Sequence, residues 1–145
     1  MAPAPHAWHA RVQVEILTLL APLARSSGLV TLGPFHLGNP TDFRVPDGGC
    51  LRDAPDAVWV PTALVVVEVE SPGDETWDKL GFYASAGVEE VFVVSPTRRE
   101  LVWLACSVGA PGSTAYERAE ASRVLGPASR DLVGSVCWPA GGPAG

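Results

Sequence analysis

The sequence predicts an α/β protein with a mixed β-sheet flanked by helices. Three observations support this fold class: an apolar stripe at helical spacing near the start, two strongly apolar strand patterns in the middle, and a helical segment between those strands. A chain order of one helix, several strands, a second helix and two more strands implies one mixed sheet covered by helices.

The length and composition fit a single globular domain. The chain has 145 residues, of which 47% are hydrophobic and 18% are charged. A chain of this size buries enough surface to be stable without disulfide bonds or a structural metal. We therefore expect one domain over residues 1–145, with flexible ends at 1–7 and 139–145.

The sequence also indicates the cellular compartment of the protein. No apolar run approaches the roughly 18 residues of a membrane-spanning helix, so we expect no membrane segment. The 3 cysteines are widely spaced and form neither a disulfide framework nor a CxxC metal motif. The N-terminal residues lack the pattern of a signal peptide. Together these features predict a cytoplasmic protein with reduced thiols.

The first third of the chain predicts a helix followed by short strands. Residues 8–21 carry apolar side chains at helical spacing, and Pro22 is expected to kink or end that helix. Extended pieces separated by Gly and Pro follow and predict a small antiparallel meander. These pieces are 29–32, 34–37, 42–45 and 56–60.

The middle of the chain carries the clearest strand. ALVVVEVE at 63–70 predicts a buried strand, and the turn at 71–74 leads into a helix over 75–86. Asp74 is a candidate N-cap of this helix, and Gly87 is a candidate C-terminal stop. The predicted elements beyond the helix are a hairpin of 90–95 with 101–106, a strand at 115–120 and a weak helix at 129–138.

Two carboxylates end the strongest strand. Glu68 and Glu70 share one face of the strand with Leu64 and Val66. The two acidic positions are about 6.6 Å apart along the strand. At an effective dielectric constant near 20, charges at that distance repel by roughly 2.5 kcal/mol. The pair therefore requires water, neutralising bases or a divalent cation, and a solvated strand end is the simplest of these interpretations.

The residues around this strand resemble a known family. RVPD at 44–47, the run LVVVEVESPGDETWDKLGFYASAGVEEVFVVSP at 64–96 and the N-terminal helix are similar to the Uma-two family. That family is related to the PD-(D/E)XK restriction-endonuclease-like nucleases. The resemblance covers about 9–106 and is strongest over 64–96. It implies a restriction-endonuclease-like mixed β-sheet flanked by helices.

The resemblance also implies an acidic metal site. Asp47 matches the acidic residue of the PD half-motif, and Glu68 matches the second acidic residue, on the central strand. Glu70 stands where many nucleases of the superfamily carry Lys, so it either adds a metal ligand or disrupts the site. Lys79 matches the helix lysine that takes over in the Uma-two family. The implied metal ligands are Asp47, Glu68 and Glu70, and the implied catalytic residues are these three and Lys79.

The implied chemistry is hydrolysis of phosphodiester bonds. Mg²⁺, or Mn²⁺ in its place, prefers oxygen ligands and keeps several waters, which leaves positions for a phosphate oxygen and an attacking water. Lys79 would orient the hydroxide or stabilise the charged phosphorane. The resemblance implies nucleic acid as the substrate, with DNA the expected form, and a homodimer is the expected assembly.

Several residues have a second interpretation. On a helical wheel Lys79 shares its side with Tyr83 and not with Trp77, so it is either a solvated lysine or a long side chain that enters the site. Pro55-Asp56 is a second PD dipeptide that could replace Asp47 as the half-motif. The remaining alternatives are zinc binding by His6 and His9, and a supporting role near the site for Asp42 or Glu15.

The charge of the chain leaves a second function open. The formal net charge is −6, and the chain has no basic strip with interleaved aromatic residues. The alternative is a catalytically inactive restriction-endonuclease-like domain that binds a protein or forms a dimer. Glu70, which departs from the nuclease pattern, favours this alternative.

Overall fold

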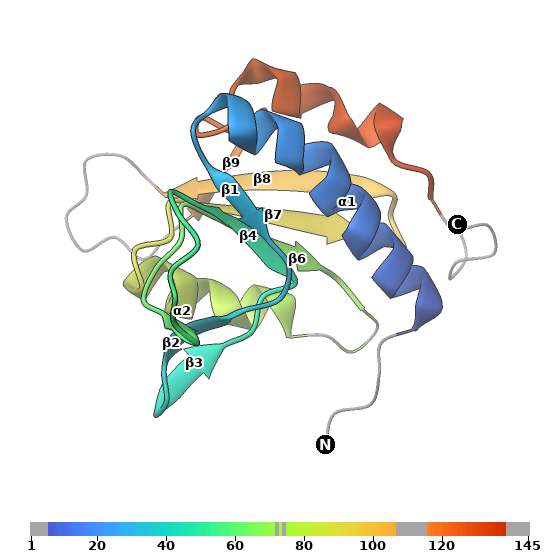
Figure 1. Cartoon of the computed structure of the whole chain (residues 1–145). Coiled ribbons are helices and arrows are strands. Elements are labelled where there is room, and N and C mark those ends of the chain that lie inside the picture. The colour runs from blue at the N-terminus through green and yellow to red at the C-terminus, as the bar shows by residue number, and fades with distance from the viewer. Residues whose placement is uncertain (1–5, 72, 74, 107–115, 139–145) are drawn as a thin grey trace.

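A six-stranded mixed sheet forms the centre of the computed structural model, which describes residues 6–71, 73, 75–106 and 116–138. The strand order is β1 (Val30–Leu32), β4 (Gly48–Leu51), β6 (Val65–Val69), β7 (Glu90–Ser95), β8 (Glu100–Cys106) and β9 (Tyr116–Ala119) (Figure 1). The neighbours β6 and β7 are parallel, and all other neighbours in this sheet are antiparallel. The predicted mixed sheet is confirmed.

Three short strands form a second sheet in the order β3 (Asp42–Arg44), β2 (His36–Asn39) and β5 (Trp59–Val60). β2 is antiparallel to β3 but parallel to β5. The predicted antiparallel meander is therefore wrong in two respects, because β5 runs parallel to β2 and because β1 joins the large sheet. The local pattern of each strand does not specify which partner it finds.

β4 is a strand although its sequence has no strand pattern, and its two glycines explain both the missing pattern and the position of the strand. Gly48 and Gly49 lack the branched or aromatic side chains that indicate a strand. A Cβ atom at Gly49 would lie 2.7 Å from the carbonyl oxygen of Val65, and one at Gly48 would lie 2.8 Å from that of Leu32. Only glycine lets β4 fit between β1 and β6 at this spacing.

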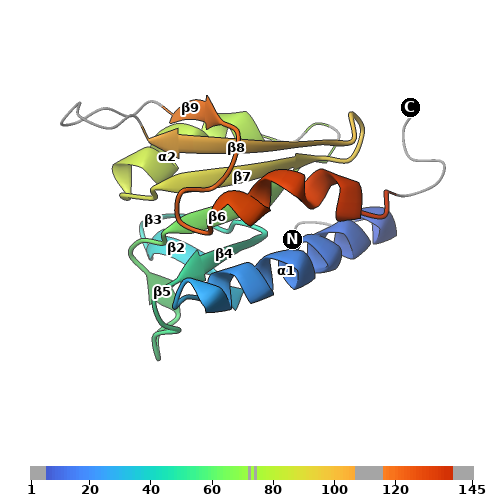
Figure 2. The same cartoon turned by 90° about the horizontal axis from the view of Figure 1, so that it is seen from above.

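Helices cover the two faces of the large sheet. On one face lie α1 (Ala7–Ser26) and the 3₁₀ helix η2 (Pro127–Ser135), and on the other lie η1 (Thr76–Lys79), α2 (Leu80–Ser85) and the small sheet (Figure 2). Each face has its own core, and β6 contributes Val67 to the first and Val66 to the second. None of the helices in the described ranges is long and apolar enough to cross a membrane.

The first helix is longer than predicted. It continues through Pro22 to Ser26, where the sequence suggested an end or a kink. Proline removes one hydrogen bond, to the carbonyl of Thr18. Thr18 and Pro22 are both exposed, so water can reach that carbonyl oxygen and the helix continues. The buried stripe of the helix is His9, Val12, Ile16, Leu20 and Ala24.

The second helix ends where predicted. Gly87 has a φ of 82°, its N–H donates to the carbonyl of Ala84, and the N–H of Val88 donates to the carbonyl of Tyr83. This is the Schellman arrangement that favours glycine at its left-handed position. The first turn is a 3₁₀ helix rather than an α-helix. Asp74, the predicted N-cap, lies outside the described residues.

A buried carboxylate ties the C-terminal segment to the sheet. Glu90 is at the start of β7, and its Oε1 accepts a hydrogen bond from the Ser122 hydroxyl at 2.5 Å. Its Oε2 accepts one from the N–H of Arg123 at 2.8 Å. The Ser122 Oγ in turn accepts from the N–H of Leu125. The turn that precedes η2 is therefore built around the Glu90 side chain.

We predict that Glu90→Gln lowers the free energy of unfolding by about 1.5–3 kcal/mol, because a hydrogen bond to an ionised group is lost and an amide N–H₂ faces a donor. Urea unfolding followed by circular dichroism measures this change. Glu89→Gln is the control, since Glu89 is an exposed neighbour with a similar side chain. Equal stability of the two variants would contradict the structural role of Glu90.

A second prediction concerns the buried thiol of Cys50 in β4. Burial raises the pKa of this thiol from 9.0 to about 11, against a smaller opposing effect of the Thr31 hydrogen bond, while the Glu90 charge adds to the rise. Above pH 9 the unfolded chain loses this proton before the folded protein does, so stability falls between pH 9 and 11. The contribution is about 3 kcal/mol across that window.

Cys50→Ala removes this contribution. Its free energy of unfolding, measured in urea at half-unit steps from pH 8 to 11, should fall less steeply with pH than that of the wild type. The tyrosines titrate in both proteins and cancel in the comparison. Parallel curves for the two proteins would show that Cys50 does not contribute.

Candidate functional site

Glu68 is a buried carboxylate at the end of β6. Only 1% of the residue is exposed, so the interpretation of Glu68 as part of a solvated strand end is wrong. Val67 and Val69 face α1, and Glu68 and Val66 face α2, as the alternation predicts. Leu64 departs from the prediction, because the strand begins at Val65 and Leu64 packs on the α1 side.

Two side chains from the η1–α2 segment contact the same oxygen of Glu68. The Tyr83 hydroxyl donates a hydrogen bond to Oε1, and the Lys79 Nζ lies 3.6 Å from that oxygen. Positions four apart on a helix share a face, which is why both reach the same group. Lys79 therefore extends toward the carboxylate rather than into water, and its side chain is 24% exposed. A buried carboxylate needs compensation of this kind.

Asp47 lies beside Glu68 on the neighbouring strand connection. Its N–H donates to the carbonyl of Val67 at 3.0 Å, and its Oδ2 accepts from the N–H of Val69 at 2.8 Å. These two partners flank Glu68 along β6. The Asp47 carbonyl also accepts a hydrogen bond from Gln13 Nε2 of α1 at 2.9 Å. The acidic residue of the PD dipeptide is thus fixed next to the acidic residue of the central strand.

Both carboxylates act on the Tyr83 hydroxyl. Burial is the main reason that the pKa of Tyr83 is raised far above its ordinary value, followed by the charge of Glu68 and the hydrogen bond to it, and then by the charge of Asp47. The Arg44 charge lowers it. The hydroxyl keeps its proton at neutral pH and remains a donor.

Glu70 has a different environment from the other two carboxylates. It follows the end of β6, and its Oε1 accepts a hydrogen bond from Trp77 Nε1 at 2.6 Å and lies 3.6 Å from Arg98 Nη2. Within the described ranges no three His, Cys, Asp or Glu side chains form a group that could hold a metal ion. Asp47 is bonded to the backbone on either side of Glu68, and the predicted third ligand, Glu70, contacts Trp77 and Arg98 instead.

Comparison with known proteins identifies the family. The Uma2 family, described as "Putative restriction endonuclease", matches residues 1–128. This protein belongs to the Uma2 family. Its fold is similar to the crystal structure of "a putative nuclease belonging to DUF820" from Anabaena variabilis ATCC 29413, with a TM-score of 0.62 and 12% identity over 80% of this chain and 69% of that one. No curated protein matches the chain.

The family resemblance of the sequence is thereby confirmed, and the α/β fold matches that of the DUF820 structure. At 12% identity the solved structure shows the fold alone. The positions of Asp47, Glu68 and Lys79 in this Uma2 protein rest on its own geometry. Their catalytic roles, and the metal role of Glu70, stay predictions.

His9 is a site residue that the sequence did not single out for this place. It is buried in the first turns of α1, and its Nε2 lies 3.0 Å from the Val69 carbonyl oxygen and 3.8 Å from Asp47 Oδ2. Its Nδ1 has no hydrogen-bond partner among the described residues. His6 is exposed and stacks on Trp8, and neither histidine belongs to a group of three potential metal ligands among the described residues. The signal for His9 was its place on the buried stripe, one turn before Val12.

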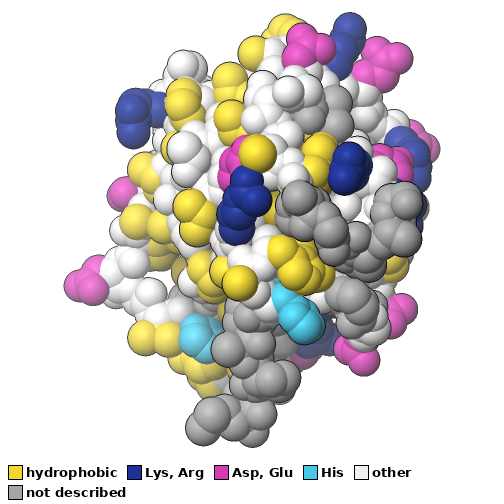
Figure 3. Space-filling view, turned by 90° about the vertical axis from the view of Figure 1, so that its right-hand side faces the viewer, with side chains coloured by type: hydrophobic (Ala, Val, Ile, Leu, Met, Phe, Trp, Pro, Cys, Tyr) yellow, Lys and Arg dark blue, Asp and Glu magenta, His cyan; other side chains and the backbone are white. Residues whose placement is uncertain are grey.

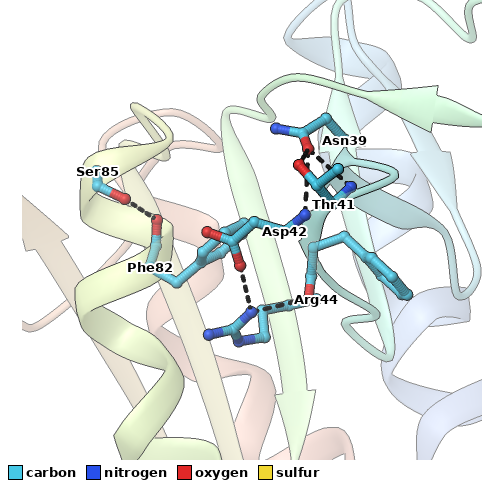
Figure 4. Close-up of polar contacts among 7 residues, drawn as sticks. Asn39, Thr41, Asp42, Arg44, Phe82 and Ser85 are labelled. Carbon is cyan, nitrogen blue, oxygen red and sulfur yellow. Dashed lines mark hydrogen bonds and ion pairs between the residues drawn. The ribbon is translucent and has the colours of Figure 1, made fainter.

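Arg44 connects the small sheet to α2. Its Nη1 donates to Asp42 Oδ1 at 3.0 Å, and its guanidinium lies 4.5 Å from the centre of the Phe82 ring (Figure 4). Asp42, a candidate supporting group, is thus paired with Arg44 on the surface. Glu15 is directed elsewhere, since its Oε1 accepts a hydrogen bond from the N–H of Cys137. Asp56 is exposed beyond the far end of β4, so Asp47 is the aspartate beside Glu68.

We predict that Lys79→Met lowers the free energy of unfolding by about 2–3 kcal/mol, because Glu68 loses its positive partner while it stays buried. Arg98→Met is the matched control: the Arg98 side chain is 53% exposed and lies near both Glu70 and Glu100, so about 0–1 kcal/mol is expected there. Urea unfolding at pH 7 measures both. A Lys79→Met protein as stable as Arg98→Met would contradict the pairing of Lys79 with Glu68.

Proposed function

We propose that this Uma2 protein is a metal-dependent nuclease that hydrolyses phosphodiester bonds at a site made by Asp47, Glu68 and Lys79. The observation that supports the proposal is that Asp47 bonds the backbone of Val67 and Val69 on either side of the buried Glu68, while the Lys79 Nζ lies 3.6 Å from the Glu68 carboxylate. The family is described as "Putative restriction endonuclease" and the similar DUF820 protein as "a putative nuclease", and both descriptions support the same activity.

The donor set fits Mg²⁺ or Mn²⁺. Both ions prefer oxygen ligands, and Mg²⁺ in phosphate-handling sites is usually held by one or two carboxylates, with water and substrate phosphate filling the other positions. Asp47 and Glu68 supply such a pair without a third protein ligand. Glu70 is held by Trp77 and Arg98 through its Oε1. When bound, the ion would polarise the phosphodiester and lower the pKa of a bound water.

The protein's own residues supply positioning and charge. Asp47 is held by the main chain of β6, so its carboxylate has a fixed place. Lys79 has a flexible stem and an ammonium group at the site, which suits it to orient the attacking water or to stabilise negative charge on the phosphate. Tyr83 is fully buried behind Glu68 and keeps its proton, so it serves as a donor and not as a base.

The substrate of this proposal is nucleic acid, and DNA is the form to test first. The side of the molecule toward which β6 and β7 run has positive, negative and hydrophobic side chains interspersed (Figure 3). With a net charge of −6, contact with the phosphate backbone would depend on the divalent ion more than on a basic surface. The homodimer predicted from the sequence is part of the same proposal, and light scattering after gel filtration tests it.

We predict that Glu68→Gln and Asp47→Asn each weaken Mn²⁺ binding at least 10-fold and abolish nicking of supercoiled plasmid DNA in Mg²⁺, because each removes a charged oxygen ligand. Free Mn²⁺ measured by electron paramagnetic resonance gives the dissociation constant, and agarose gels give the nicking rate. Both assays use the full chain at a temperature where circular dichroism shows each variant to be folded.

Glu90→Gln is the control for this experiment. This variant neutralises the other buried glutamate of the parallel pair β6–β7. Glu90 pairs with Val65 at the start of the two strands, away from Glu68, so the Mn²⁺ affinity and nicking rate of the variant should match the wild type. A wild type that binds no Mn²⁺ at millimolar concentration, or variants that nick as fast as the wild type, would rule out the proposal.

A second candidate is a non-catalytic binding module, and one surface favours it. His36, Phe43 and Trp59 contact one another at ring-centre distances of 4.8–5.5 Å on the small sheet, and 38% of Phe43 is exposed. Exposed aromatic groups of this kind are common at protein interfaces. The Mn²⁺ titration distinguishes the two candidates, because a binding module needs no metal at Glu68.

A further inference from the structure

A buried tyrosine hydroxyl bonds the buried carboxylate of Glu68. Tyr83 is completely buried in the core on the α2 side, and its hydroxyl lies against Oε1 of Glu68. An apolar core would accept phenylalanine at this position without a polar partner. The hydroxyl is therefore explained by its bond to Glu68 and not by packing.

The other tyrosine, Tyr116, is partly buried and shows what a structural hydroxyl does in this protein. Tyr116, at the start of β9, donates to the main-chain carbonyl oxygen of Val88 at 2.7 Å. That bond ties an edge strand to a loop and involves no acidic side chain. Tyr83 and Tyr116 are the two tyrosines of the chain, and only Tyr83 bonds a carboxylate among the hydrogen bonds that the described residues make.

The two contacts to Glu68 Oε1 differ in kind. The Tyr83 hydroxyl forms a hydrogen bond, which fixes both a distance and a direction. The Lys79 Nζ is 3.6 Å away, which is longer than a hydrogen bond and gives attraction without a fixed direction. A glutamate side chain has several rotatable bonds, and holding it in one conformation costs entropy that a directional, charge-assisted bond can offset.

We propose that Tyr83 is a positioning residue for Glu68: its hydroxyl holds the carboxylate in the orientation that receives the divalent ion, while Lys79 stays able to turn toward the substrate. This inference rests on the proposed nuclease function. Tyr83 contacts neither the ion nor the nucleic acid. Tyr83 acts through Glu68. Its directional hydrogen bond suits it to orient the carboxylate, and the longer contact of Lys79 leaves that side chain able to move.

Tyr83→Phe tests the proposal, because it keeps the ring and removes only the hydroxyl. We expect Mn²⁺ affinity to fall by about 10-fold and kcat for plasmid nicking to fall by about 10- to 100-fold, the range typical of groups that orient metal ligands. The KM for DNA should not change. A merely structural hydroxyl would change stability and leave the Mn²⁺ dissociation constant as it is.

Tyr116→Phe is the matched control, since it removes the same atom from a partly buried tyrosine away from the site. Its Mn²⁺ affinity and kcat should equal those of the wild type. If Tyr83→Phe also binds Mn²⁺ and nicks DNA like the wild type, while Glu68→Gln does neither, the positioning role is overturned and the nuclease proposal stands. If Glu68→Gln binds Mn²⁺ normally, the nuclease proposal itself fails.

A measurement on the intact sequence covers the case in which Tyr83→Phe does not fold. Protein labelled with 3-fluorotyrosine gives two ¹⁹F resonances, one for each tyrosine, and Tyr116→Phe assigns them. Addition of Mg²⁺ should shift the Tyr83 resonance with the same midpoint as metal binding and leave the Tyr116 resonance in place. A Tyr83 resonance that stays unchanged at saturating Mg²⁺ overturns the proposal.

Discussion

The buried charge of Glu68 is the constraint to which the surrounding elements conform. A carboxylate with 1% exposure on a central strand requires a donor and a cation close by, and both come from one segment, η1–α2. The position of that segment is fixed at its other end by the Gly87 turn, which leads directly into β7. The helix, the turn and the parallel strand pair therefore form one unit around a single ionised group.

The close approach of β4 completes this unit. The glycines of β4 let the strand lie against β6, and the residue just before them is Asp47. The bonds of Asp47 to Val67 and Val69 then follow from the register of the two strands. A second acidic residue lies opposite Glu68 on the neighbouring chain segment because two side chains are absent from β4. Backbone packing, rather than any attraction between the acids, sets this register.

Much of the fold could be predicted from local pattern, and the exceptions have physical reasons. The valine-rich strands and the helix end at Gly87 could be predicted because hydrophobic periodicity and the residue preferences of turns are local features of the sequence. The strand β4 and the parallel β5 were not, since their pairing depends on residues far along the chain. Asp47, Glu68 and Lys79 came from the family resemblance. The partners of Glu70 and the place of His9 did not, because the Trp77–Glu70 and His9–Val69 hydrogen bonds leave no pattern in residue spacing.

Lys79 is the one lysine in the sequence, and it stands at Glu68. The chain thus has a single side-chain amine. Its nine arginine guanidinium groups stay protonated and do not react with acylating reagents at neutral pH. Among the side-chain amines, reagents that modify lysine would therefore reach only Lys79, at the candidate centre. Lys79 is therefore a selective position for attaching a probe, a crosslinker or an affinity tag at the candidate site.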